Sequence, residues 1–285
     1  MIFEQVQQVL VVGLGLLGGS YAKSLRKKGF KVDAITLDES DIRYALDNDI
    51  IDHGTTEIDA NMIQRADLIV FSVYPHVFVD WIRENGHLIR PGTIVTDVTG
   101  VKECIVDTVQ TLLPSGVEFV AAHPMAGREV GGVRNSDESI FFGANYLVVP
   151  TERNTEKAIQ LCCELGWVLG FAKVSCLSPK KHDEMIGFLS QLTHCIAVSL
   201  MCACDEPEME KYTGDSFRDL TRIANINDEM WSELFLANRE TLLHQMEDYR
   251  ACFNRLYDYL QCEDRDGLRE MMRLSTARRK QFDKR

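Results

Sequence analysis

A glycine-rich segment near the amino terminus constrains the fold of this chain more than any other feature. Residues 11–18 read Val-Val-Gly-Leu-Gly-Leu-Leu-Gly, so three glycines follow an apolar run in the spacing G-x-G-x-x-G. In a strand–turn–helix unit the first glycine makes a tight turn, the second lets backbone approach a pyrophosphate, and the third lets helix and strand pack closely. The start of the helix adds partial positive charge. The segment therefore predicts a dinucleotide site formed by Gly13, Gly15, Leu16, Leu17 and Gly18.

The order of apolar runs predicts two domains. Up to residue 177 short apolar runs alternate with helical stretches, which is typical of a parallel sheet with crossover helices. We expect strands at QVLVVGLG, KVDAITL, ADLIVFSV, TIVTDV, EFVAAH, NYLVVP and FAKVSCL. Ser178-Pro179 is a good helix start, and after Pro207 no proline interrupts the helical pattern. We therefore predict an α/β dinucleotide-binding domain over residues 1–177 and a helical domain over residues 178–285. A helical domain of this size often completes its core against a second copy, so we expect a homodimer.

Charge and cysteine usage narrow the class of protein. The net charge of −12 disfavours nucleic acid and anionic membranes as partners. The nine cysteines contain no C-x-x-C pair, which argues against a disulfide framework or a metal site and suits a reducing cytosol. We see no apolar run long enough to cross a bilayer and no secretory start, so we expect a cytoplasmic protein. An anionic substrate would need a local cluster of cations.

The end of the second predicted strand bears on the choice of cofactor. An acidic residue usually stands there and holds the ribose hydroxyls, but here Thr36 takes the place and Asp38 comes two residues later. The next arginine is Arg43, so the usual device for the extra phosphate of NADP is absent. NAD is favoured and NADP stays open. Ser72 lies at the end of the strand ADLIVFSV, and Tyr74 follows that strand. Both are expected beside the cofactor.

His123 is the candidate base. It follows the strand residues EFVAA, and in an open α/β sheet ligands lie at the carboxyl ends of the strands. A histidine held there by Pro124 could face a nicotinamide. A purely structural histidine, hydrogen-bonded at the strand end, is the alternative, and position alone does not decide between them.

The helical half offers polar residues at helical spacing. Gln191 and His194 lie three apart in an otherwise apolar stretch and so share a helix face, although such a histidine is more often a satisfied core residue. Arg218 and Arg222 lie four apart, where like charges repel unless an anion lies between them. A salt-bridged helix is the alternative, because aspartates interleave with these arginines.

Taken together, these segments resemble the prephenate/arogenate dehydrogenase family over nearly the whole chain. The motifs that carry the resemblance are GLGLLGGSYAKSLRKKG, DNDIIDHGTT, TDVTGVK, HPMAGRE, SPKKHD, SQLTH, and FRDLTRIA followed by Met230-Trp231. One such motif would be unremarkable, but seven in the family's order are highly specific. The resemblance implies a Rossmann domain followed by a helical dimerisation domain. It also implies an NAD(P)-dependent oxidative decarboxylation in tyrosine biosynthesis, in which a ring loses hydride and carbon dioxide and becomes aromatic.

The resemblance assigns roles to individual residues. His123 matches the catalytic histidine, which accepts a hydrogen bond and then the proton from the substrate hydroxyl. Arg222 matches an arginine that binds a substrate carboxylate, and His194 matches a pocket histidine. Arg218 corresponds to a basic pocket residue and Glu129 to an acidic residue near the pocket entrance.

Three positions depart from the family pattern. The family turn is often G-S-V-K, with a serine that assists the histidine, and here it is Thr99-Gly100. Thr99 is therefore a candidate substrate-binding residue in place of that serine. Gln191 replaces a histidine and can hydrogen-bond but carries no charge. Thr36 replaces the expected acid.

Two other functions stay open. A related oxidoreductase acting on a hydroxy acid or imine would place a lysine or aspartate in the middle of the first long helix after the α/β domain, but Lys180 and Lys181 lie in its first turn. A nucleotide-sensing protein without turnover is supported only by the departures at Gly100 and Thr36. Neither prephenate nor arogenate is favoured as substrate by the sequence.

Overall fold

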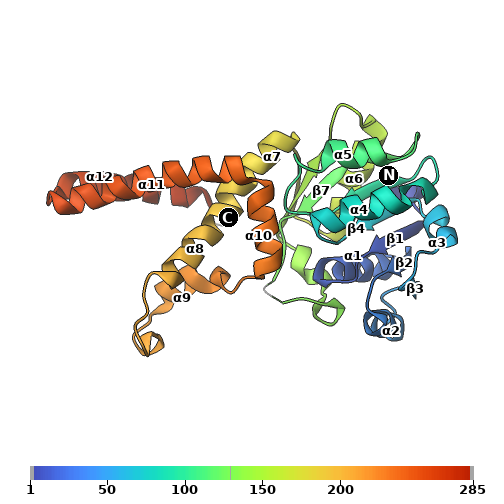
Figure 1. Cartoon of the computed structure of the whole chain (residues 1–285), viewed down its shortest axis with the longest axis horizontal. Helices are drawn as coiled ribbons and strands as arrows, with labels where there is room; N and C mark the ends of the chain where they lie inside the picture. The colour runs from blue at the N-terminus through green and yellow to red at the C-terminus, as the bar shows by residue number, and fades with distance from the viewer. Residues whose placement is uncertain (1–2, 129, 283–285) are drawn as a thin grey trace. The chain divides into compact units, whose positions relative to one another are not determined.

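The computed structural model describes residues 3–128 and 130–282. Its internal contacts divide the chain into two compact units, one ending at Asn238 and the other beginning at Arg239. The larger unit holds the β-strands and helices α1 to α10, and the smaller unit holds α11 and α12 (Figure 1). The predicted boundary at residues 177/178 coincides with the start of α7. At this boundary the chain changes from alternating strands and helices to helices alone, and the larger compact unit continues beyond it to Asn238.

Six parallel strands form the main sheet, in the order β3-β2-β1-β4-β5-β6. Their bounds are β1 (Gln8–Val12), β2 (Lys31–Ile35), β3 (His53–Thr55), β4 (Leu68–Phe71), β5 (Ile94–Asp97) and β6 (Glu118–Phe119). Strands β4 and β5 are buried along their whole length, because helices cover both faces of the sheet. The strand order reverses between β1 and β4, and the crevice at the carboxyl ends of such strands is where α/β sheets bind ligands.

The last strands form a separate three-stranded sheet, which corrects the expectation of a single parallel one. It contains β7 (Ala121–Pro124), β8 (Asn145–Val149) and β9 (Lys173–Cys176). The predicted strand EFVAAH is divided into two. Its first half, β6, pairs parallel with β5, and its second half, β7, pairs antiparallel with β8. The pairing is antiparallel because the chain between β7 and β8 returns through a loop with two short 3-10 turns instead of a crossover helix.

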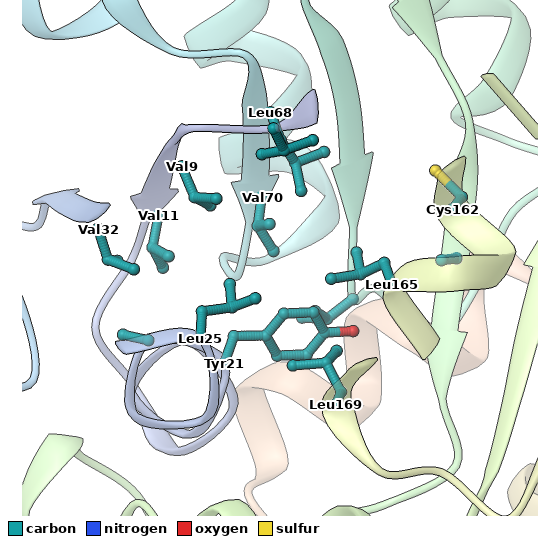
Figure 2. Close-up of a cluster of buried hydrophobic side chains, with 14 of the residues drawn as sticks. Val9, Val11, Tyr21, Leu25, Val32, Leu68, Val70, Cys162, Leu165 and Leu169 are labelled. Carbon is teal, nitrogen blue, oxygen red and sulfur yellow. The ribbon is translucent and has the colours of Figure 1, made fainter. Parts of the chain in front are cut away.

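Two layers of helices cover the main sheet. Side chains of α1 (Leu16–Lys27), α2 (Glu39–Asp47) and α6 (Glu156–Leu169) share one apolar cluster with strand residues such as Val9 and Val11. Figure 2 shows Tyr21 and Leu25 of α1 and Leu165 and Leu169 of α6 gathered with these valines. The opposite cluster contains side chains of α3 (Ala60–Arg65), α4 (Pro75–Asn85) and α5 (Val106–Leu112). The sheet is thus held between two apolar layers, and only its strand ends are left for polar chemistry.

The three glycines of the turn after β1 differ in their surroundings, and two of them have the packing roles predicted from their spacing. Gly13 has φ +95°, and a Cβ there would lie 2.4 Å from the carbonyl oxygen of Ser72. A Cβ at Gly18 would lie 1.9 Å from the carbonyl oxygen of Gly13, so helix and turn touch through backbone. A Cβ at Gly15 would meet no atom of the chain within 4 Å. Gly13 and Gly18 therefore serve the fold, and Gly15 leaves the backbone open to a ligand.

After β9 the larger unit is helical. It contains α7 (Pro179–Ile186), a π-helical segment (Gly187–Gln191), α8 (Leu192–Cys202), α9 (Asp215–Thr221), a 3-10 turn (Arg222–Ala224) and α10 (Asp228–Ala237). The side chain of Ser178 accepts a hydrogen bond from the backbone N–H of Lys181, which confirms the predicted helix start.

The segment Pro179–Cys202 corrects one expectation from the sequence. By length and composition alone, this continuous helical segment is long and apolar enough to cross a membrane, with mean hydropathy 1.6 over its most apolar window. Nevertheless it buries His182, Asp183 and Gln191 in hydrogen bonds with the rest of the larger unit. The apolar side chains that it exposes include Phe188, Leu189 and Met201.

The smaller unit is a pair of helices, α11 (Arg239–Gln261) and α12 (Arg265–Arg279). Asp264 caps α12 by accepting a hydrogen bond from the backbone N–H of Gly267. Leu242 is the only residue of α11 that is buried, and α12 buries none. An apolar stripe stays exposed along α11, made of Leu243, Met246, Tyr249, Phe253, Tyr257 and Leu260. A two-helix unit of this kind cannot bury its own apolar surface.

Alanine substitutions at Gly15 and Gly18 should separate cofactor binding from folding. Gly15 has φ −73°, which alanine adopts freely, so the free energy of unfolding of Gly15→Ala should lie within about 1 kcal/mol of that of the unsubstituted protein. Its affinity for dinucleotide should nevertheless be at least tenfold lower. Gly18→Ala should lose about 1–3 kcal/mol or more, because its Cβ overlaps backbone. Urea unfolding and dinucleotide titration measure the two effects, and a stable Gly18→Ala variant would contradict the assigned packing role.

Candidate active site

The turn between β1 and α1 is built to receive an anion. Gly15 stands at the amino-terminal cap of α1 and supplies no side-chain hydrogen bond to it. The first backbone amides of α1, which include those of Leu16 and Leu17, therefore face outward with the positive end of the helix dipole. Ser72 lies against this turn, since its side chain is 3.0 Å from where a Cβ of Gly18 would stand. These residues fit the pyrophosphate of a dinucleotide.

Thr36 and Asp38 lie at the predicted place after β2 but make contacts of different kinds. The hydroxyl of Thr36 accepts a hydrogen bond of 3.4 Å from the backbone N–H of Leu14, so it braces the glycine turn. The carboxylate of Asp38 caps α2, and hydrogen bonds from Ser40 lower its pKa. Tyr74 caps α4 without a side-chain hydrogen bond, and its hydroxyl accepts a bond of 3.4 Å from the side chain of Asn227.

His123 lies on β7, beside the carboxyl end of β5, because the backbone N–H of the preceding Ala122 donates to Asp97, the last residue of β5. His123 pairs with Leu147 of β8, and its Nδ1 lies 2.9 Å from Nε2 of His182, which comes from α7. Burial, the neighbouring His182 and the charge of Lys102 hold the pKa of His123 well below its usual value. His123 is therefore neutral at neutral pH, which is the state that can accept a proton.

His182 and Asp183 continue this line of contacts. His182 is fully buried, and its Nδ1 lies 2.7 Å from Oδ1 of Asp183. The carboxylate of Asp183 also accepts hydrogen bonds from the backbone N–H groups of Lys102 and Glu103, at 3.0 and 2.9 Å. Burial lowers the pKa of His182, although the hydrogen bond to Asp183 opposes that effect.

A buried ion pair holds the loop after β5. Nζ of Lys102 donates to Oδ2 of Asp97 at 2.6 Å and to the hydroxyl of Thr99 at 3.0 Å, and both charged side chains are fully buried. The other oxygen of Asp97 accepts the backbone N–H of Ala122, the residue before His123, at 3.0 Å. Burial lowers the pKa of Lys102, and the pairing with Asp97 opposes that shift. The hydroxyl of Thr99 donates to Asp97, so it belongs to this buried cluster.

Helix α10 closes one side of the site. Leu234 lies against Gly100, where a Cβ would stand 3.3 Å from its Cδ1. The side chain of Gln191 donates to the carbonyl of Leu234 at 2.9 Å and accepts from Asn238 at 2.7 Å. Asn238 also donates to the carbonyl of Asp183. Gln191 is thus fully buried and bonded to protein at both ends of its amide, and it connects α10 with the His182–Asp183 turn.

Three of the remaining predicted residues, His194, Arg218 and Arg222, lie on helical segments. His194 stacks on Trp231 with ring centroids 3.8 Å apart, and its Nδ1 lies 2.8 Å from the carbonyl oxygen of Ser190. Arg218 donates to the carbonyl of Thr213 and lies 3.8 Å from Asp215, so its described contacts are local. Arg222 begins the 3-10 turn that packs against α8. Glu129 lies outside the described residues.

Four residues of this cluster were not predicted as functional, namely Asp97, Lys102, His182 and Asp183. Their motifs, TDVTGVK and SPKKHD, carried the resemblance, but only Thr99 among the residues of these motifs was given a role. A His-Asp dipeptide in the first turns of a helix is the one local signal that could have indicated them. Among the described residues, no group of three or more histidines, cysteines or acids could hold a metal ion.

The arrangement suits proton abstraction beside a dinucleotide. A neutral histidine stands at the strand ends, supported by a buried histidine and carboxylate, and a helix amino terminus for a pyrophosphate lies at the same edge of the sheet. Such a site can remove the proton of a hydroxyl while a nicotinamide accepts hydride from the same carbon.

Two protein-family descriptions match this chain. The one described as "Prephenate dehydrogenase, nucleotide-binding domain" matches residues 21–170, and "Prephenate dehydrogenase, dimerization domain" matches residues 178–274. The chain is 28% identical to prephenate dehydrogenase of Bacillus subtilis over 270 residues, which cover 91% of this chain and 72% of that protein. It is 25% identical to cyclohexadienyl dehydrogenase of Zymomonas mobilis, with 96% and 95% covered.

Solved structures agree with these matches. Prephenate dehydrogenase from A. aeolicus in complex with hydroxyphenyl propionate and NAD+ superimposes with a TM-score of 0.89 at 31% identity, covering 97% of this chain and 98% of that one. Synechocystis arogenate dehydrogenase superimposes with a TM-score of 0.84 at 25% identity, covering 97% and 100%.

Substitution of Lys102 tests the buried ion pair. Lys102→Met removes the cation beside Asp97 and should lower the free energy of unfolding by about 3–5 kcal/mol, because an uncompensated carboxylate stays buried. Arg83→Met is the matched control. It breaks an exposed pair with Asp80 and should change stability by less than about 0.5 kcal/mol. Equal losses in the two variants, measured by urea unfolding, would contradict the structural role of Lys102.

Proposed function

Because this chain belongs to the prephenate dehydrogenase family, we propose that it oxidatively decarboxylates prephenate, arogenate or both, with His123 as the base. It is an NAD-dependent dehydrogenase of tyrosine biosynthesis. The observation that carries the role of His123 is its place on β7, neutral and bonded to a buried histidine, at the ligand-binding edge of the sheet.

The proposed reaction needs one proton acceptor and one hydride acceptor. NAD, when bound, supplies the hydride acceptor. His123 takes the proton of the ring hydroxyl as hydride leaves the same ring carbon. The bond to the ring carboxylate then breaks, carbon dioxide leaves, and its electrons complete the aromatic ring and place negative charge on the oxygen. The proton held by His123 returns to that oxygen, so the residue ends neutral as it began.

The substrate carboxylates require cations, which the overall charge of −12 makes scarce. We assign Arg222 to a carboxylate, since its guanidinium can bind two oxygens at once. His194 is assigned to the pocket wall, where its stacking on Trp231 fixes the ring plane. Arg218, Thr99, Gln191 and Glu129 remain proposed substrate-side residues. Thr99 and Gln191 would act through the buried contacts described above.

Assembly and location are further parts of the proposal. The apolar stripe on α11 and the exposed Phe188 and Leu189 support a homodimer formed by the helical segments, and the dimerisation family match covers the same residues. All nine cysteines are free thiols, which supports a reducing, cytoplasmic location. The net negative charge supports a small-molecule substrate rather than nucleic acid or membrane as partner.

The function is tested by absorbance at 340 nm with purified protein, with prephenate and arogenate each combined with NAD and NADP. Growth of signal with NAD and at least one substrate is expected, and the four combinations identify substrate and cofactor together. Folded, NAD-binding protein that stays silent in all four would overturn the proposal.

His123→Asn should abolish most turnover without disturbing the fold. A positioned base contributes about 10²–10⁴ in rate, so kcat should fall by that factor, while NAD affinity and unfolding midpoint stay close to those of the unsubstituted protein. His87→Asn, an exposed histidine after α4, is the control and should keep full activity. Near-normal turnover of His123→Asn would remove His123 from the mechanism.

Arg222→Gln should weaken substrate binding in preference to catalysis. Loss of a charge-assisted pair with a carboxylate is expected to raise KM by at least tenfold, or about 1.4 kcal/mol, with a smaller change in kcat. Arg222→Lys should restore little, because an ammonium cannot reproduce the two-oxygen contact. An unchanged KM in steady-state kinetics would contradict the assignment.

A further inference from the structure

The contacts of His123 determine which of its two ring nitrogens carries hydrogen. A neutral imidazole has one N–H and one lone pair, and the partner of each nitrogen decides which is which. His123 uses Nδ1 to contact Nε2 of His182 at 2.9 Å, so the hydrogen between these nitrogens belongs to one ring or to the other. The partner of the second nitrogen of His182, Nδ1, decides which ring carries this hydrogen.

Asp183 settles it. Its carboxylate accepts hydrogen bonds, so Nδ1 of His182, 2.7 Å from Oδ1, must be the donor. A neutral His182 then has its lone pair on Nε2 and accepts the Nδ1–H of His123. That leaves the lone pair of His123 on Nε2, the nitrogen that a base needs. Burial lowers the pKa of His182, which keeps it in the neutral form that this order of hydrogen bonds requires.

Asp183 is itself held in place by the loop after β5. Backbone N–H groups of Lys102 and Glu103 donate to its two oxygens, and Asn238 donates to its main-chain carbonyl. The carboxylate therefore cannot turn away from His182 without breaking both bonds, and leaving the buried N–H of Lys102 unpaired costs about 1–3 kcal/mol. Its orientation is fixed before any substrate binds.

The charge that His123 gains during the reaction also needs a counterion. Lys102 lies on the same side and disfavours positive charge on both histidines. Asp183 is the acid bonded to the histidine pair, while both oxygens of Asp97 are occupied by Lys102, Thr99 and Ala122. A proton taken up at Nε2 of His123 can be shared along the bond to His182, and its charge then lies next to the carboxylate of Asp183.

We propose that His182 and Asp183 are positioning residues that fix His123 as the tautomer with hydrogen on Nδ1 and share its positive charge during turnover. This inference rests on the proposed function only for the moment of proton transfer. The tautomer itself is a property of the protein without substrate, so the two claims can fail separately.

The first test is nitrogen-15 NMR of histidine-labelled protein at neutral pH without ligands. The His123 ring signals are assigned by their loss in His123→Asn. The expected result is a protonated Nδ1 and an unprotonated Nε2. A protonated Nε2 on His123 would overturn the proposal, whatever the 340 nm assay shows. A silent 340 nm assay with the expected tautomer would overturn the proposed function alone.

The second test reverses the order of hydrogen bonds. In Asp183→Asn an amide oxygen at the Oδ2 position keeps the hydrogen bonds from the backbone N–H groups of Glu103 at 2.9 Å and Lys102 at 3.3 Å, whereas an oxygen at the Oδ1 position loses the one from Glu103. The amide nitrogen therefore faces His182 and donates to its Nδ1. His182 must then donate from Nε2, and His123 becomes protonated at Nε2. The NMR signals should show this switch, and kcat should fall by about 10²–10⁴, with KM and NAD affinity changed by less than about threefold.

Two further variants separate positioning from a general structural role. His182→Gln offers an amide oxygen to the Nδ1–H of His123 but cannot share charge, so it should keep the tautomer and lose part of kcat. His53→Gln is the matched control, because His53 also pairs with a buried aspartate, Asp33, but in the middle of β2 and not at the strand ends where His123 lies. It should leave kcat and the His123 signals unchanged. Parallel loss of unfolding midpoint, NAD affinity and kcat in Asp183→Asn, without a tautomer switch, would overturn the proposal.

Discussion

The buried ion pair between Lys102 and Asp97 is the contact on which the geometry of the site depends. Burying both charges is costly, and the cost is offset because Asp97 accepts hydrogen bonds from Lys102, from the hydroxyl and backbone N–H of Thr99, and from the backbone N–H of Ala122. The same loop uses the N–H groups of Lys102 and Glu103 to hold Asp183. One short segment after β5 therefore places His123 on one side and His182 on the other.

Much of the fold and part of the site were predictable from the sequence, because their signals are local. The glycine spacing predicted the turn and the packing roles of Gly13 and Gly18. The apolar runs predicted every strand in the described part of the chain except β3, a three-residue edge strand without a buried run. The place of His123 at the end of a strand was also visible. These features depend on residues a few positions apart, which periodicity and spacing describe well.

What the sequence could not predict depends on contacts between distant residues. The bond between His123 and His182 joins positions 59 apart, and that between Lys102 and Asp183 joins positions 81 apart. No spacing rule connects them, and a buried lysine in particular has no local signature. The antiparallel return of β8 was missed for a related reason, since it follows from the loop after β7 and from pairing, which the apolar pattern of a single strand does not encode.

The departure at Gly100 has a physical explanation in Leu234. A side chain at position 100 would press against this leucine, so α10 fills the space that a serine would need.

The π-helical segment Gly187–Gln191 decides which insertions and deletions the helix can tolerate. A π turn holds one residue more than an α turn, so it takes up an extra residue without rotating the helix that follows. Deleting one residue there would convert the π turn into an α turn and leave His194 on the face that stacks on Trp231. The same deletion within α8, before His194, would turn the rest of α8 by about 100°, so this helix tolerates a change of length at the π turn and not beyond it.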